Sequence, residues 1–186
     1  MRLDPIAASV SASLRRLNAI SERDGWDRPP SLWAMRRDLS TDEEGVTVQL
    51  DIRRIDTGPV FLTPQPAAAL SAYARDIAAR SMPEEFRGTI LAYVFVTEAW
   101  MVLGNDESIT RAGVEHTIHQ RADRIEVRIL SAVDSAGIVY SHIYPRDPAR
   151  SDQRMETAGR PGETGAVLSL DGAVIDALRT LIDAST

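Results

Sequence analysis

The fold is decided by the stretch ILAYVFVTEAWMVL at residues 90–103. Both alternating sets of side chains in this stretch are mainly apolar, and many of them are β-branched or aromatic. This pattern is typical of a strand covered on both faces, although a buried helix would read similarly. We therefore expect residues 90–103 to form the central strand of a sheet.

A hairpin is expected beside this strand, at residues 125–144. Residues 124–132 alternate charged and apolar side chains, which predicts a strand with one wet face. Asp134-Ser135-Ala136-Gly137 is a tight-turn sequence, and residues 138–144 then return as the partner strand.

The rest of the chain supplies a second hairpin and three helices. Alternation at 46–55 indicates a strand that pairs with residues 32–39. Proline near a cap and stripes at helical spacing predict helices at about 5–24, 64–82 and 171–183. Few apolar residues lie between Pro145 and Gly165, which predicts a mobile loop at 145–165. The expected fold is one α+β domain over 1–186, a mainly antiparallel five-stranded sheet with the three helices packed on one face.

Composition restricts the function. The chain has no cysteine, which excludes disulfides, thiolate metal ligands and cysteine nucleophiles. A net charge of −6 disfavours binding to a phosphate backbone, so no nucleic-acid partner is expected. No apolar run reaches the roughly 18–20 residues of a membrane span, and no secretory signal is visible, so we expect no membrane association and a cytoplasmic location.

The familiar catalytic motifs are absent from the sequence. It contains no phosphate-binding glycine loop and no Gly-x-Ser-x-Gly elbow. The best metal candidate is Glu115-His116-x-x-His119, because residues three apart share a helical face. Two exposed histidines beside a strand explain the same pattern, and we favour that reading. No cofactor is predicted.

Glu98 interrupts the otherwise apolar central stretch. A buried carboxylate costs several kcal/mol unless it is paired. Arg128 or Arg124 on the neighbouring strand could pair with it. One reading makes Glu98 a general base in a pocket; the reading we favour is a solvated residue or a cross-strand ion pair.

Tryptophans and arginine pairs are the remaining candidates. Trp26 follows Asp-Gly and precedes Asp-Arg-Pro-Pro, so we place it at a surface groove or a dimer contact. Trp33 and Trp100 are expected in the core. Neighbouring arginines such as Arg53-Arg54 point to opposite faces of a strand, so each pair offers at most one guanidinium to a given pocket.

Three stretches carry a resemblance to other proteins. They are Trp26–Trp33, Leu62-Thr63-Pro64, and 122–128 with the turn at 134–137. In these stretches and their spacing, over about residues 24–144, the chain resembles a group of small actinobacterial or actinobacteriophage proteins of unknown function. The use of arginine for all 21 basic residues indicates a high-GC genome. The resemblance implies an origin and supports the strand assignments, and it implies no site.

We therefore expect a non-enzymatic, cytoplasmic protein that interacts with a protein partner or with itself as a homodimer. One alternative is a small-ligand- or metal-dependent enzyme with a site near Glu98, His116 and His119, assisted by Arg128. A second alternative is a phage factor that binds a host protein.

Overall fold

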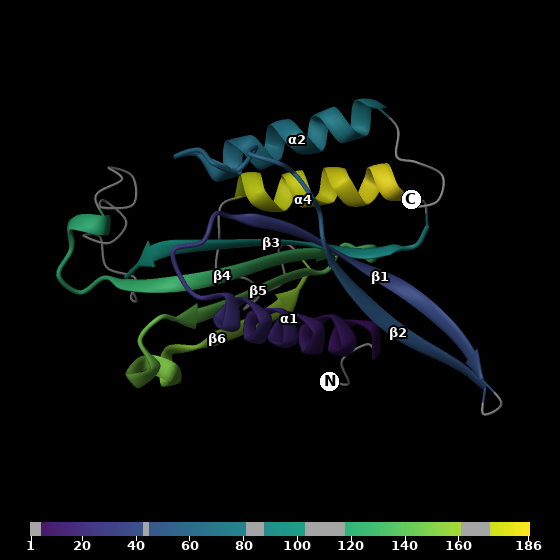
Figure 1. Cartoon of the computed structure of the whole chain (residues 1–186), viewed down its shortest axis with the longest axis horizontal. Helices are drawn as coiled ribbons and strands as arrows, with labels where there is room; N and C mark the ends of the chain where they lie inside the picture. The colour runs from purple at the N-terminus through teal and green to yellow at the C-terminus, as the bar shows by residue number, and fades with distance from the viewer. Residues whose placement is uncertain (1–4, 43–44, 81–87, 103–117, 161–171) are drawn as a thin grey trace.

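The computed structural model describes residues 5–42, 45–80, 88–102, 118–160 and 172–186. Its centre is an antiparallel six-stranded sheet in the order β2-β1-β3-β4-β5-β6 (Figure 1). The α+β class is confirmed, but the sheet has six strands and not five. The strands are β1 (Ser31–Asp42), β2 (Gly45–Arg54), β3 (Ile90–Met101), β4 (Ile125–Asp134), β5 (Val139–Pro145) and β6 (Met155–Gly159).

The predicted central strand is β3. It pairs with β1 on one side, from Ser31↔Val96 to Arg36↔Ile90, and with β4 on the other. Seven consecutive side chains from its first residue are buried, as two covered faces require. The predicted hairpin beside it is also confirmed as β4 and β5.

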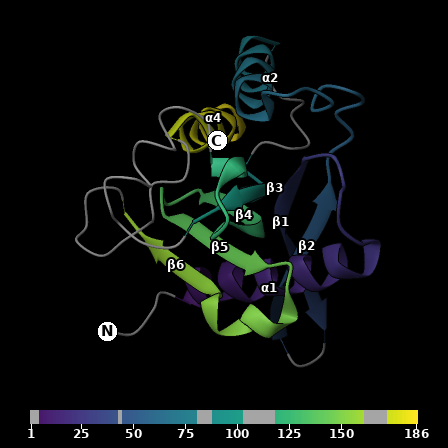
Figure 2. The same ribbon diagram turned by 90° about the vertical axis from the view of Figure 1, so that its left-hand side faces the viewer.

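Helices cover both faces of the sheet, so the prediction that they share one face is wrong. Helix α1 (Pro5–Asp24) packs on one face, whereas α2 (Pro66–Arg80) and α4 (Gly172–Ser185) lie over the other (Figures 1 and 2). The cause is β3 itself: Val94 packs under α1, and Phe95 packs under α4. A strand apolar on both sides needs both covers. None of the described helices is long and apolar enough to cross a membrane.

The β4–β5 turn is held by the buried carboxylate of Asp134. Its Oδ1 accepts hydrogen bonds from the backbone N–H groups of Ala136 and Ile138, at 2.9 and 2.8 Å. Its Oδ2 accepts from the Tyr140 hydroxyl at 2.7 Å. Gly137 has φ +77°, a conformation that glycine adopts without steric cost. The predicted turn chemistry therefore explains why the hairpin register is fixed.

The sixth strand lies inside the segment predicted to be a loop. Residues 148–153 form short 3-10 turns, and β6 then pairs antiparallel with β5 from Ile143↔Met155 to Val139↔Gly159. Edge strand β6 has little apolar patterning, and polar contacts hold it in place. The Glu156 carboxylate accepts a hydrogen bond from Arg15 Nε of α1 at 2.9 Å. Residues 161–165 lie outside the described residues, so the predicted mobility of the segment stays a prediction.

Candidate functional site

Glu98 and Arg128 form a buried ion pair near the ends of β3 and β4. They are directly opposite each other in the strand register, on the face that α1 covers. The Arg128 Nη2 donates to Glu98 Oε1 at 3.0 Å, and the two side chains are 2% and 13% exposed. The favoured reading of Glu98, a cross-strand ion pair, therefore agrees with the structure, and Arg128 rather than Arg124 is its partner.

The turn at residues 25–27, just after α1, binds both members of this pair. Arg128 Nη2 donates to the carbonyl oxygen of Gly25 at 2.9 Å. The backbone N–H of Asp27 donates to Glu98 Oε2 at 2.7 Å. Gly25 and Asp27 have φ values of +91° and +63°, and this left-handed backbone turns the chain sharply over the pair. The end of α1 is thereby fixed to the middle of the sheet.

Trp26 is half-buried between two arginines. The Arg128 guanidinium carbon lies 4.3 Å from its ring centroid, and that of Arg146 lies 5.5 Å away. Cation–π contacts of this kind are worth about 2 kcal/mol when they are desolvated. The structure thus places Trp26 at the surface end of the Glu98–Arg128 pair.

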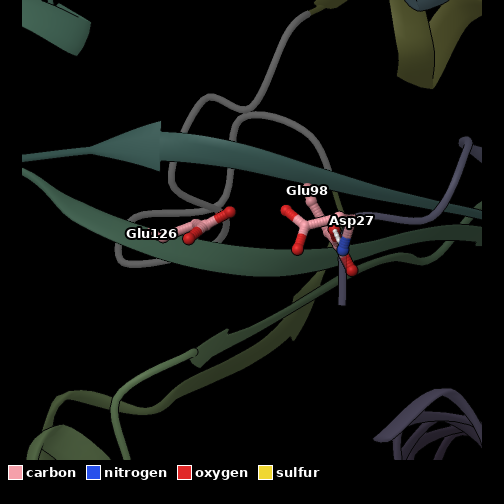
Figure 3. Close-up of side chains that lie close together, drawn as sticks. All are labelled: Asp27, Glu98 and Glu126. Carbon is pink, nitrogen blue, oxygen red and sulfur yellow. Dashed lines mark hydrogen bonds between the residues drawn. The ribbon is translucent and has the colours of Figure 1, made fainter. Parts of the chain in front are cut away.

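Three carboxylates converge beside Trp26, from Asp27, Glu98 and Glu126 (Figure 3). Their oxygens lie within 4.8 Å of one another, which by itself resembles a cation site. In this structure arginine side chains neutralise the carboxylates. Arg146 donates to Asp27 at 3.0 Å and to Glu126 at 2.8 Å, and Arg128 donates to Glu98. These hydrogen bonds, that to Asp27 first, raise the pKa of Arg146 above its ordinary value, so it stays charged.

A cleft of about 310 Å³ opens next to the ion pair. It lies between the end of α1 and the sheet, and Trp33 and Val96 also line it. Its charged lining residues are the arginines Arg28, Arg54 and Arg128 and the acids Asp24 and Glu98. Three cations face two anions, so the cleft has a local positive excess in a chain of net charge −6.

Two of these arginines have unused donors. The Nη1 atom of Arg128 is buried and has no hydrogen-bond partner in the described part of the chain. The side chain of Arg54 is exposed and forms no hydrogen bond or ion pair with another described residue. By contrast, Arg28 donates through Nε and Nη2 to the Asp24 carbonyl, at 2.8 and 2.6 Å. Arg54 and Arg128 therefore both have spare hydrogen-bonding capacity in the cleft.

The predicted histidine site is not assembled in the described residues. Glu115 and His116 lie outside them. His119 is exposed in the short 3-10 turn Ile118–Gln120, where its Nε2 is 3.3 Å from the Gln120 amide. Among the described residues, the grouping of Asp27, Glu98 and Glu126 contains no histidine. A metal site at His116 and His119 stays a prediction.

Trp33 and Trp100, both expected in the core, differ in their burial. Trp33 is half-buried, and its indole N–H donates to the Ser31 hydroxyl at 2.9 Å. Trp100 is 44% exposed, so its predicted place in the core is wrong. It projects beyond the end of α1, on the α1 face, with the Arg124 guanidinium 4.7 Å from its ring centroid. Large exposed aromatics are enriched at interfaces, and Trp100 joins Trp26 as such a candidate.

Sequence reasoning missed a buried polar cluster around His142 on β5. The imidazole is 1% exposed, and its Nδ1 lies 3.2 Å from the Tyr144 hydroxyl. Tyr144 in turn donates to Glu156 at 3.2 Å. Burial lowers the pKa of His142 to about 4 and raises that of Tyr144 to about 12. The alternation of β5 was the available signal, since it places 140, 142 and 144 on one face.

Comparison with known proteins gives no further assignment. No protein-family model, curated protein or solved structure matches this chain. The resemblance to small actinobacterial or phage proteins therefore stays a prediction.

Proposed function

We propose that this chain is a non-enzymatic binding protein that takes an acidic segment of a protein partner into the cleft beside Glu98 and Arg128. The main support is Arg128: this residue lines the cleft, and its buried Nη1 has no hydrogen-bond partner among the described residues. A carboxylate is the group that an arginine with a spare donor binds best.

The arrangement of the cleft supports a carboxylate ligand. Arg128 is held in place, because its Nη2 donates to both Gly25 and Glu98 and its guanidinium lies over the Trp26 ring. A prepositioned cation loses little conformational entropy when it binds. Arg54 lines the same cleft from the end of β2 and adds a second donor set. Acidic segments are commonly recognised by arginine clusters of this kind.

The use of Glu98 argues against the enzyme alternative. A general base needs a carboxylate oxygen directed at a substrate proton. Both Glu98 oxygens already accept hydrogen bonds, from Arg128 and from the Asp27 backbone. The residue is thus occupied as an ion-pair partner.

A titration with short capped peptides tests the proposal. Calorimetry should detect binding of tetraglutamate and no binding of tetraglutamine, because the arginines recognise charge. A hydrogen bond to a charged group is worth about 1.5–3 kcal/mol. Arg54→Ala should therefore weaken tetraglutamate binding about tenfold.

The matched control is Arg37→Ala, which removes another exposed arginine on the adjacent strand β1, outside the cleft lining. It should bind tetraglutamate as the unchanged protein does. Equal binding of the two peptides, no binding of either, or an equal effect of the two substitutions would overturn the proposal.

A further inference from the structure

A second cavity lies on the opposite face of the sheet, beneath α2 and α4. Its volume is about 330 Å³, within the range of small-molecule sites. Ile55, Ile77 and Leu181 line it together with the side chains of Tyr73 and Tyr93. The interior is therefore mainly apolar, unlike the cleft on the α1 face.

The cavity lies beside a break in the strand register. Pairing between β1 and β3 shifts between Met35 and Arg36 and ends at Arg36↔Ile90. Beyond this point the β1–β2 hairpin continues to Asp42↔Gly45 and diverges from the two helices (Figure 1). Bulges of this kind commonly redirect side chains beside binding sites.

Three arginines also line this cavity: Arg36, Arg53 and Arg54. No acidic residue is among its described lining residues. The nearest counter-charge in the register is Asp51, which faces Arg36 across the hairpin and pairs with Arg53. Among the described lining residues the charged groups are therefore all cations, and Arg54 forms no side-chain ion pair with another described residue. The expectation that Arg53 and Arg54 could not share a pocket is wrong here, because Arg54 ends its strand.

The phenol groups add hydrogen-bonding capacity. Tyr93 bonds to Ser185 of α4 at 2.9 Å. Burial, followed by the charges of Asp76 and Asp56, raises the pKa of Tyr73. The Tyr73 hydroxyl thus stays protonated to a higher pH than an ordinary phenol, and Tyr73 is one of the residues that line the cavity.

We propose that this cavity binds a small organic carboxylate, with the apolar body of the ligand between the β1–β2 hairpin and α2 and its carboxylate at Arg53 and Arg54. The apolar lining favours binding, because the apolar surface of the ligand is removed from water in the cavity. The arginines select an anion, because guanidinium and carboxylate form paired hydrogen bonds.

Thermal shift and calorimetry with simple probes test this proposal. Octanoate and phenylacetate distinguish an alkyl from an aryl body, and octylamine carries the opposite charge. Binding of either acid, with no effect of octylamine, is the expected result. Arg53→Ala should weaken binding of that acid about tenfold.

A filled cavity is the sharper test. Ile77→Trp places a large ring in the cavity from α2 and should abolish binding of the acid. Ala78→Trp adds the same ring at the next, exposed position of the helix, outside the lining, and should bind normally. Tetraglutamate binding should survive in both variants, so failure here is distinct from failure of the proposed function. Equal binding of octanoate and octylamine, no binding of either acid, or full binding by Ile77→Trp would refute the site.

Discussion

Replacing Glu98 by glutamine should destabilise the protein by about 3 kcal/mol. Breaking a buried ion pair by removing one charge costs about 3–5 kcal/mol, because the remaining charge is left uncompensated. Arg128 is 2% exposed, and Glu98 is 13% exposed, which places the cost near the lower limit. The change also sets an amide against the donors of Arg128 and the Asp27 backbone. Urea unfolding measures the loss directly.

A double-mutant cycle separates the pair from its surroundings. Arg128→Met keeps much of the volume of the side chain and removes its charge. The double variant Glu98→Gln/Arg128→Met should cost at least about 2 kcal/mol less than the two single losses together, as residues in contact are coupled. If the losses add, or if Glu98→Gln costs less than about 1 kcal/mol, the pair is effectively solvated and our account of the site is wrong.

Three further predictions concern other polar contacts. The pKa of His142 is lowered to about 4 from an ordinary 6.5, so the stability due to its neutral form is complete above pH 6.5 and is lost as the pH falls toward 4. The free energy of unfolding should fall by about 3 kcal/mol across that window, and His142→Gln should flatten the fall in urea titrations. Trp26→Leu should cost about 2 kcal/mol and Trp100→Leu less than about 1, because only Trp26 stacks on a buried arginine; equal losses in thermal unfolding would contradict this. Tyr140→Phe should cost about 1.5–3 kcal/mol by removing a hydrogen bond to the buried Asp134, whereas Tyr73→Phe, at the cavity, should cost less by the same assay.

Local pattern was sufficient for most of the fold. The two apolar faces of β3, the alternation of β4 and the turn at Asp134 each specify their own structure, and neighbouring strands in the sheet mostly follow the chain order. Strand β6 could not be predicted, because its support comes from Arg15 and from the edge of β5 and not from its own side chains. An apolar run in the sequence predicts burial, and Trp100 lies in such a run, so it was wrongly expected in the core. In the structure α1 ends before it can cover that end of β3.

The candidate site was predicted only in part. The expected neighbour of the central strand offered Arg128 or Arg124 as the partner of Glu98, and the turn-forming residues around Trp26 indicated a surface position. Glu98, Arg128 and Trp26 come together through the turn at residues 25–27. The position of that turn depends on how α1 packs on the sheet, which local sequence pattern does not specify. The shared position of Arg54 between the two cavities depends similarly on the end of β2.

The turn at residues 25–27 also has a consequence for the order of assembly during synthesis. Its partners Glu98, Arg128 and Arg146 come from 71, 103 and 119 residues further along the chain. Hairpins can pair as each strand leaves the ribosome, since their partners are adjacent in sequence. Helix α1 is translated before these partners, so the contacts of the turn that follows it are complete only after β5 has been made. An element translated before the sheet is thus among the last to be secured.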